Sequence, residues 1–289
     1  MPLITLTTDF GIKDHFVGAI KGAIFSELPN INIVDISHEI APFNIAETAY
    51  IVKNAYKSFP KGTIHIIGVD SELTKETKHI ALLLDEHYFI CPDNGVISMI
   101  TTEFNPQQIV EINIHNHIAS SFPVLDVFVQ VACHIARGGT LDVIGKSLPE
   151  IKKIKDLQPL ISTDRKKIVG SVIYIDNYGN VITNIDKKLF TQVQQGRKFE
   201  IRAKGHTFKT VYEKYSEIIN FDIPAEKRYH EGEKLAIFNS AEFIELAIFK
   251  SNPKSVGSAS TLLGLEYRDA ITISFVDEEK PDFELADKI

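Results

Sequence analysis

The segment ITLTTDFGIKDHFVGAIKGAI, residues 4–24, contains the two periodicities from which the fold can be predicted. Residues 4–8 form an apolar, β-branched run that is typical of a strand. In residues 14–28 apolar side chains recur every three to four positions, which predicts a helix with Asp14 as its N-cap. A strand that leads directly into a helix is the basic unit of an α/β protein, and Asp9 then lies at the carboxyl end of the strand, where such proteins bind ligands.

The rest of the first half repeats this alternation. Further strands are predicted in INIVDIS and GTIHIIGVD, further helices in NIAETAYIVKNAYKSF and VLDVFVQVACHIARGG, and a pair of strands joined by a turn in HIALLLDEHYFICPDNGVISMI. Strand–helix alternation predicts a mostly parallel sheet that is flanked by helices. The sequence therefore favours an α/β fold class for the first half of the chain.

The second half has a different pattern. Six short apolar runs follow one another with little helix between them: KIVGSVIYID, VITNI, KFEIRAKGHTF, KLAIFN, FIELAIF and AITISFV. This pattern predicts a smaller, antiparallel β domain. Charge rises and two prolines occur in residues 147–167, which we take as the linker. We expect an α/β domain at 1–155 and a β domain at 168–278.

Composition narrows the class of protein. The 289 residues carry a net charge of −7, which argues against nucleic acid as a partner. Cys91 and Cys133 lie in apolar runs and are expected to be buried structural thiols in a reducing compartment. No apolar run approaches the roughly 18 residues that a membrane span requires, and no signal segment is recognisable. We expect a soluble, cytoplasmic protein without a membrane partner.

Three carboxylates end apolar strands: Asp9, Asp35 and Asp70. Each could be a local cap or turn residue. If the strands are parallel neighbours, however, the carboxylates gather at one edge of the sheet and suit a vicinal diol or a cationic ligand. No glycine-rich phosphate loop is present. The expected ligand is nucleoside-like and carries little or no phosphate.

Two polar runs are further candidates for ligand contact. CPDNGVIS, residues 91–98, reads as a tight turn, whereas YIDNYGNVITNI, residues 174–185, is rich in Asp and Asn, which are poor strand formers. We expect the second run to contact a ligand. The ten histidines show no metal-ligand spacing, and HNH at 115–117 is expected to be a surface pair in a strand. No metal site is expected.

Taken together, these segments resemble a known family. TTDFGIKDHFVGAIKGAI, VDISHEIAPFNIAETAYIV, IHIIGVD, CPDNGVIS, IDNYGNVITNI and NSAEFIELAI follow one another as in the S-adenosylmethionine hydroxide adenosyltransferases, which are related to the fluorinase and chlorinase. The resemblance covers about residues 3–276. It implies a homotrimer whose active sites lie between the first domain of one subunit and the second domain of its neighbour. It also implies that Asp9 holds the ribose hydroxyls, Asp176 and Ser240 the amino-acid end of methionine, and that Asn180 lies in the adenine region.

The chain departs from this family where catalysis is expected. The resemblance implies an Asp-Arg-His set that acts on water, of which Asp70 is retained. Thr77 stands at the Arg position with Lys78 beside it, and Pro123 stands at the His position, so that only Asp126 remains of a His-Gly-Arg-Asp segment. Loss of such polar groups typically costs orders of magnitude in rate.

Two functions remain open from the sequence. The first is hydrolysis of S-adenosylmethionine to adenosine and methionine, by in-line displacement at the ribose C5′, with Asp70 and Lys78, or alternatively His79, orienting the water. The alternative is a non-catalytic S-adenosylmethionine- or adenosine-binding protein. A halogenase is less favoured because SELTKETKHI replaces the glycine-rich loop that is expected to form part of a halide site. Either way the partner is a small molecule, and we expect no cofactor.

Overall fold

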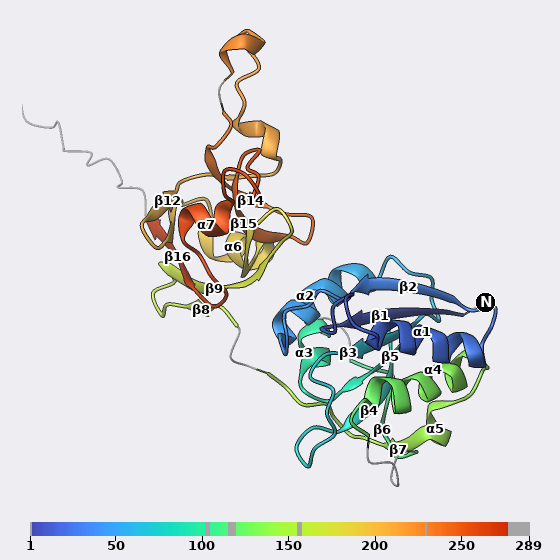
Figure 1. Ribbon diagram of the computed structural model, residues 1–289. Coiled ribbons are helices and arrows are strands. Elements are labelled where there is room, and N and C mark those ends of the chain that lie inside the picture. The colour runs from blue at the N-terminus through green and yellow to red at the C-terminus, as the bar shows by residue number, and fades with distance from the viewer. Residues whose placement is uncertain (1, 102–104, 115–119, 155–157, 229, 277–289) are drawn as a thin grey trace, which may run out of the picture. The chain divides into compact units, whose positions relative to one another are not determined.

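The chain divides into two compact units, residues 1–155 and 156–289. The computed structural model describes residues 2–101, 105–114, 120–154, 158–228 and 230–276. The expected surface histidine pair at 115–117 therefore lies outside the described residues. Each unit has its own sheet (Figure 1). Each also has its own apolar core.

The first unit contains a seven-stranded sheet with the order β2-β1-β3-β5-β4-β6-β7. β1, β2, β3 and β5 pair in parallel, whereas β4, β6 and β7 join the sheet antiparallel. The expected α/β fold class is confirmed. The elements are β1 (Leu3–Thr8), α1 (Phe16–Glu27), β2 (Asn32–Ser37), α2 (Ile45–Tyr56), β3 (Ile64–Gly68), β4 (His79–Leu84), β5 (His87–Pro92), α3 (Val96–Ile100), β6 (Gln108–Ile112), the π-helical turn η1 (Val124–Phe128), α4 (Val129–Ala136), α5 (Leu141–Ile144) and β7 (Gly145–Ser147).

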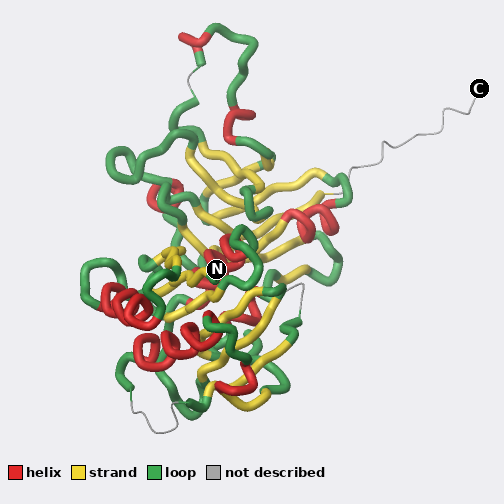
Figure 2. The backbone as a smooth tube through the Cα atoms, turned by 90° about the vertical axis from the view of Figure 1, so that its right-hand side faces the viewer, coloured by secondary structure: helices red, strands yellow, loops and turns green. Residues whose placement is uncertain are grey.

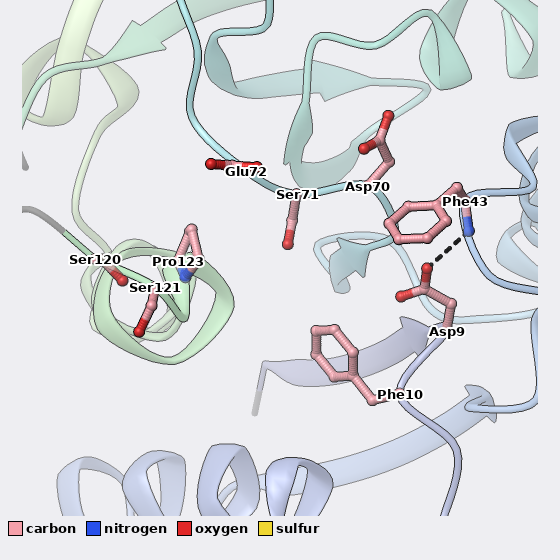
Figure 3. Close-up of a pocket in the computed structure, with 9 residues that line it drawn as sticks. All are labelled: Asp9, Phe10, Phe43, Asp70, Ser71, Glu72, Ser120, Ser121 and Pro123. Carbon is pink, nitrogen blue, oxygen red and sulfur yellow. Dashed lines mark hydrogen bonds between the residues drawn. The ribbon is translucent and has the colours of Figure 1, made fainter.

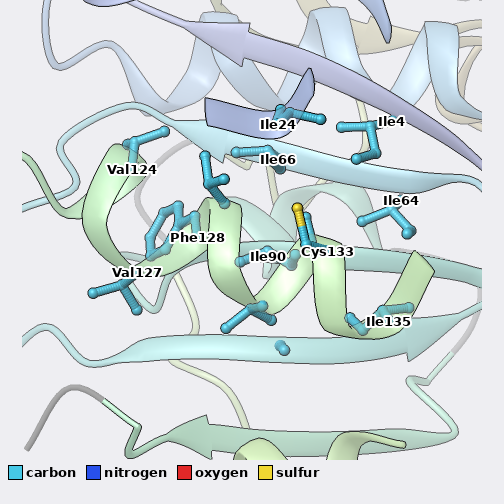
Figure 4. Packing of buried hydrophobic residues seen from close by; sticks show 14 of the residues in the cluster. Ile4, Ile24, Ile64, Ile66, Ile90, Val124, Val127, Phe128, Cys133 and Ile135 are labelled. Carbon is cyan, nitrogen blue, oxygen red and sulfur yellow. The ribbon is translucent and has the colours of Figure 1, made fainter. Parts of the chain in front are cut away.

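Helices cover both faces of this sheet. On one face α1, η1 and α4 bury Ile24, Phe128 and Cys133 against Ile66 and its neighbours (Figure 4). On the other face α2 and α3 pack against β4 and β5. Such double coverage explains the nearly continuous apolar strands. The helices leave the carboxyl ends of the parallel strands uncovered, and a ligand can bind there.

The start of α1 differs from the expectation. Asp14 is not the N-cap, because the helix begins at Phe16 and His15 occupies the cap position without a side-chain hydrogen bond. The His15 ring instead stacks on Phe16, and the Phe16 ring contacts Phe10 and Phe122. The start of this helix is thus packed by aromatic rings and has no capping carboxylate.

The second unit is built on a nine-stranded, almost wholly antiparallel sheet, which confirms the expected β domain. Among its described strands only β13 and β14 pair in parallel. Its order is β12-β11-β16-β9-β10-β15-β14-β13, with β8 added to β9. The elements are β8 (Leu160–Ile161), β9 (Lys167–Ile175), β10 (Val181–Asp186), α6 (Lys187–Gln194), β11 (Lys198–Ala203), β12 (His206–Phe208), β13 (Val211–Tyr212), the 3-10 helices η2 (Tyr215–Ile218) and η3 (Ala225–Lys227), β14 (Lys234–Phe238), β15 (Phe243–Ile248), α7 (Ala259–Leu263) and β16 (Ala270–Val276).

A long excursion connects the parallel neighbours β13 and β14. It contains η2 and η3 and extends away from the strands of the second unit, as both views show (orange in Figure 1, the loop with two short helical turns in Figure 2). The sequence offered no assignment for this segment. Its first residues, in η2, nevertheless contact the polar loop of the same unit, as described below.

Cys91 and Cys133 are free and buried, as expected. Burial raises the pKa of both thiols. Among the described residues, no helix combines the length and the apolar character needed to cross a membrane.

Candidate ligand-binding site

A pocket of about 380 Å³ opens at the carboxyl ends of β1 and β3 (Figure 3). This volume lies within the range of small-molecule sites. The pocket is lined by three kinds of side chain, namely carboxylates, hydroxyls and apolar rings: Asp9, Phe10, Phe43, Asp70, Ser71, Glu72, Ser120, Ser121 and Pro123. Parallel pairing of β1 with β3 brings Asp9 and Asp70, which are far apart in the chain, to this one edge.

Asp9 is half-buried at the end of β1. Its Oδ2 atom accepts a hydrogen bond from the backbone N–H of Phe43 at 3.0 Å. Burial raises the pKa of Asp9, the backbone N–H groups that it accepts oppose this shift, and the negative charge of Asp70 adds to it. The carboxylate is thus oriented by the backbone and remains open to the pocket.

Phe43 and Asp70 share an unusual backbone conformation. Both have positive φ angles, 62° and 49°, in the left-handed region that non-glycine residues rarely adopt. Such strain persists only where the surrounding structure enforces it, and it clusters at functional sites. The Phe43 side chain is 71% exposed. Its ring therefore offers an apolar face beside the Asp9 carboxylate (Figure 3).

The opposite wall comes from the start of η1. The hydroxyl of Ser120 donates to Oδ2 of Asp126 at 2.6 Å and accepts the N–H of Phe122. Pro123 occupies the N-cap position of η1, where its missing N–H costs nothing. The sequence predicted neither Ser120 nor Ser121 as site residues, because isolated serines carry no recognisable pattern.

The PDNG segment, residues 92–95, is hydrogen-bonded to the backbone that follows β3. The side-chain amide of Asn94 donates to the backbone carbonyl of Val69 at 3.1 Å, directly before Asp70. Gly95 adopts a φ angle of 100°, which glycine tolerates best, at the start of α3. This segment is therefore the turn that the sequence suggested, and it holds Asp70 in place through its neighbour.

Two groups predicted for the site lie elsewhere. Asp35 is not among the residues that line the pocket; it pairs with Lys21 at 2.5 Å and with His38 at 3.1 Å. Although burial opposes the shift, these partners lower the pKa of Asp35. The expectation that all three carboxylates gather in one site is therefore wrong for Asp35, because β2 continues to Ser37 and Asp35 lies within the strand, where Lys21 and His38 engage it.

Lys78 also lies apart from the lining residues. Its Nζ atom forms an ion pair with Oε2 of Glu111 at 2.5 Å, between the start of β4 and β6. The Nε2 atom of His79 lies 2.9 Å from the carbonyl oxygen of Ser71 and so supports the lining loop from outside. Of the two predicted catalytic residues, the pocket contains only Asp70.

The polar loop of the second unit lies between β9 and β10. Asp176 organises it: Oδ1 accepts the N–H groups of Tyr178 and Asn180, at 2.9 and 2.8 Å, and Oδ2 accepts the Asn180 side-chain amide at 3.1 Å. Asp176 and Asn180 are thus in direct contact. Ser240 is exposed in the turn between β14 and β15.

Two other residues of this polar run are structural. The hydroxyl of Thr183 donates to the carbonyl of Ile244, and Oδ1 of Asn184 accepts the N–H of Ser171. Both bonds join neighbouring strands of the sheet. Across the described residues of both units, no three His, Cys, Asp or Glu side chains are grouped so that they could hold a metal ion.

The fold and the site define a class: a two-unit protein whose α/β half carries a ligand pocket at the open edge of its sheet. The chain belongs to the S-adenosylmethionine hydroxide adenosyltransferase family, because the family's N-terminal domain model matches residues 4–145 and its C-terminal domain model matches residues 170–272.

Individual relatives agree with this assignment. An (R)-S-adenosyl-L-methionine hydrolase from Methanocaldococcus jannaschii is 32% identical over 95% of this chain and 97% of its own length. A fluorinase from Actinoplanes is 22% identical over 85% of this chain and 90% of its own. A crystal structure of an uncharacterised conserved protein from Thermotoga maritima superimposes with a TM-score of 0.77 at 28% identity, covering 95% of this chain and all of the other.

Proposed function

We propose that this protein hydrolyses S-adenosylmethionine to adenosine and methionine. The observation that carries the proposal is the shared pocket of Asp9 and Asp70 in a chain that matches both domain models of the family. The printed names of its hydrolase relatives specify the (R)-sulfonium epimer, so we propose this epimer as the preferred substrate.

Asp9 would bind the ribose. An ionised carboxylate can accept hydrogen bonds from both hydroxyls of a vicinal diol, and the Phe43 N–H holds it in one orientation. The exposed Phe43 ring beside it would pack against the nucleoside. Asp176, Asn180 and Ser240 of the second unit would bind the remainder of the ligand, as the family resemblance implies.

Water would be the nucleophile. Its oxygen forms a bond to the ribose C5′ while the C5′–S bond breaks, and the bonding pair passes to sulfur, which leaves as the neutral thioether of methionine. One proton is released from the attacking water. Asp70 would orient this water and accept its proton. No general acid is required, because a neutral thioether is a good leaving group, and we propose that no cofactor takes part.

The degenerate catalytic set is compatible with this chemistry. Pro123 lines the pocket at the family's His position, but the hydroxyls of Ser71 and Ser121 and the carboxylate of Glu72 also line it. Such groups can hold a water molecule by hydrogen bonds. Positioning and desolvation of the nucleophile then provide the rate enhancement.

We further propose a homotrimer that acts in the cytoplasm, with sites shared between subunits. The family resemblance supports the trimer, and the two buried free thiols fit a reducing compartment. Light scattering coupled to gel filtration tests the trimer directly: a mass of one or two chains would contradict it.

The decisive experiment follows the oxygen atom. The protein is incubated with each sulfonium epimer in water enriched in ¹⁸O, and the products are separated and weighed by mass spectrometry. We expect methionine and adenosine that carries ¹⁸O in its 5′-hydroxyl, with Asp70→Asn slower by at least roughly 100-fold. Adenosine binding without turnover would instead support the non-catalytic alternative, and chlorinated adenosine in chloride buffer would support a halogenase.

A further inference from the structure

A buried acid lies behind the polar loop of the second unit. Glu245, on β15, is only 4% exposed. Its Oε1 atom accepts a hydrogen bond from the hydroxyl of Tyr215, and the side chain of Asn239 also donates to its carboxylate. Buried glutamates are rare unless they are paired, so this arrangement requires an explanation.

Tyr215 connects this acid to the loop. Its hydroxyl oxygen accepts the side-chain amide of Asn180 at 3.4 Å, and the same amide donates to Asp176 at 3.1 Å. Asn180 is 6% exposed. Because Asp176 and the tyrosine oxygen are acceptors here, the NH₂ group of Asn180 must face them. Both amide hydrogens are then used, and the carbonyl oxygen Oδ1 remains as the acceptor of this side chain.

The same acid connects to the turn that contains Ser240. Oδ1 of Asn239 accepts the N–H groups of Ala241 and Phe243, at 3.0 and 3.1 Å. Its NH₂ group is therefore the part that faces Glu245. One buried carboxylate thus joins two segments, the loop at 176–180 and the turn at 239–242, both of which carry proposed ligand-binding residues.

We propose that Glu245 and Tyr215 are positioning residues that hold the Asn180 amide with its carbonyl oxygen toward the ligand. An acceptor held in this way recognises an N–H donor, such as the exocyclic amine of adenine, and rejects a purine with a carbonyl at that position. This inference rests on the proposed function, since the adenosyl group must bind at this loop. It adds to that function the selection of the base.

The variants Tyr215→Phe and Glu245→Gln test the inference. Each removes one hydrogen bond of this chain, and Tyr267→Phe and Glu266→Gln are matched controls at exposed positions of the same unit. We expect the KM for S-adenosylmethionine and the Kd for adenosine to rise roughly tenfold, with kcat changed less than threefold. The preference for adenosine over inosine should fall toward unity. Unchanged KM and unchanged preference, even with a lower melting temperature, would overturn the inference.

A second substitution provides a rescue. In Glu245→Gln the new side-chain amide faces the NH₂ group of Asn239. Two NH₂ donors can then meet, which disturbs the hydrogen bond between positions 239 and 245. Adding Asn239→Asp returns an acceptor opposite the new donor while its other oxygen still accepts the two backbone N–H groups. We expect the double variant to recover most of the adenosine preference. A double variant no better than Glu245→Gln alone would contradict the role of the buried pair.

One measurement needs no ligand. In protein labelled with ¹⁵N-asparagine, the side-chain amide resonances of Asn180 are identified by their loss in Asn180→Asp. Tyr215→Phe should shift them, and Tyr267→Phe should not. If wild-type protein neither binds adenosine nor turns over S-adenosylmethionine, the proposed function fails while this shift still decides whether the link exists. Unshifted resonances in Tyr215→Phe overturn the inference in either case.

Discussion

The carboxylate of Asp9 accepts the backbone N–H of Phe43 at 3.0 Å, which joins the end of β1 to the loop before α2. The two residues are 34 positions apart in the chain. Through this bond the backbone orients a carboxylate, and the carboxylate in turn holds a strained residue whose ring is exposed. The proposed binding of ribose by Asp9 and the proposed ligand contact of the Phe43 ring can therefore be tested separately.

Asp9→Ala should weaken adenosine binding by roughly 100-fold, because charge-assisted hydrogen bonds contribute most at partly buried positions. Isothermal titration calorimetry measures this, with Asp14→Ala, an exposed carboxylate beside α1, as the control. Since burial raises the pKa of Asp9, the wild-type affinity should begin to fall on acidification at a pH above the ordinary aspartate value of 3.8. An affinity equal to wild type in Asp9→Ala would remove this residue from the site.

Phe43→Gly should separate strain from binding. Glycine relieves the left-handed backbone at φ 62° but deletes the ring, so stability should stay within about 1 kcal/mol of wild type while adenosine affinity falls. Phe43→Ala loses the ring and keeps the strain. Urea unfolding and calorimetry on both variants decide the matter: unchanged affinity in the two variants would show that the ring does not contact the ligand.

Lys78→Met tests the second residue that the sequence suggested for catalysis. Because the Lys78 ammonium is paired with Glu111, we expect kcat to change less than threefold, whereas loss of a group that acts on the nucleophile costs orders of magnitude. Steady-state kinetics at saturating S-adenosylmethionine provides the measurement. A hundredfold loss of kcat would return Lys78 to the catalytic set.

Gly179→Ala should destabilise the second unit. Gly179 has a φ angle of +73°, and an added Cβ would lie 2.2 Å from Cβ of Ser258, in the segment that leads into α7. Gly196→Ala is the matched control, since its φ angle of +78° is similar but nothing lies within 4 Å of the added atom. We expect Gly179→Ala to lower the free energy of unfolding by about 2 kcal/mol more than the control does. If the two variants lose the same free energy of unfolding, the loop at Gly179 can move away from α7 without cost, and the prediction is wrong.

Acid should destabilise the first unit through a buried histidine pair. His65 is 1% exposed, contacts Thr5 Oγ1 at 2.7 Å and lies 3.2 Å from the His87 ring nitrogen. Burial, together with His87, lowers the pKa of His65 to about 3. The pKa of His65 is 6.5 in the unfolded chain and about 3 in the native protein. Between these two pH values the unfolded chain binds a proton that the native protein excludes. The contribution of His65 to stability is therefore present well above pH 6.5 and is lost as the pH falls toward 3.

The expected loss from His65 between pH 6.5 and pH 5.0 is about 1.6 kcal/mol, because the slope rises from half its value at pH 6.5 toward the full value of about 1.4 kcal/mol per pH unit. Urea unfolding at these two pH values measures it. His65→Gln should be less stable than wild type at neutral pH but should lose less on acidification. The exposed His15→Gln serves as the control, and a wild-type-like pH slope in His65→Gln would contradict the assignment.

Much of this protein can be predicted from local patterns. The strand and helix periods define the α/β half and the β half, and Asp9 and Asp70 were placed at one edge because parallel strands carry their carboxyl ends to the same side. The polar run at 174–185, which contains one Asp and three Asn, stays a predicted ligand contact, and its residues Asp176 and Asn180 lie in the loop between β9 and β10. These features depend on residues close together in the chain or on the regular geometry of a sheet.

Other features depended on partners from distant segments. Asp35 has the same local pattern as Asp9, yet Lys21 and His38 engage it outside the pocket. Lys78 is engaged by Glu111, and Glu245 is connected to Asn180 through Tyr215, in a segment for which the sequence offered no assignment. Local sequence determines which backbone forms and which side chains are available. Only the tertiary structure decides which donor meets which acceptor, because a hydrogen bond requires contact within about 3 Å and burial removes the water that would otherwise compete for it.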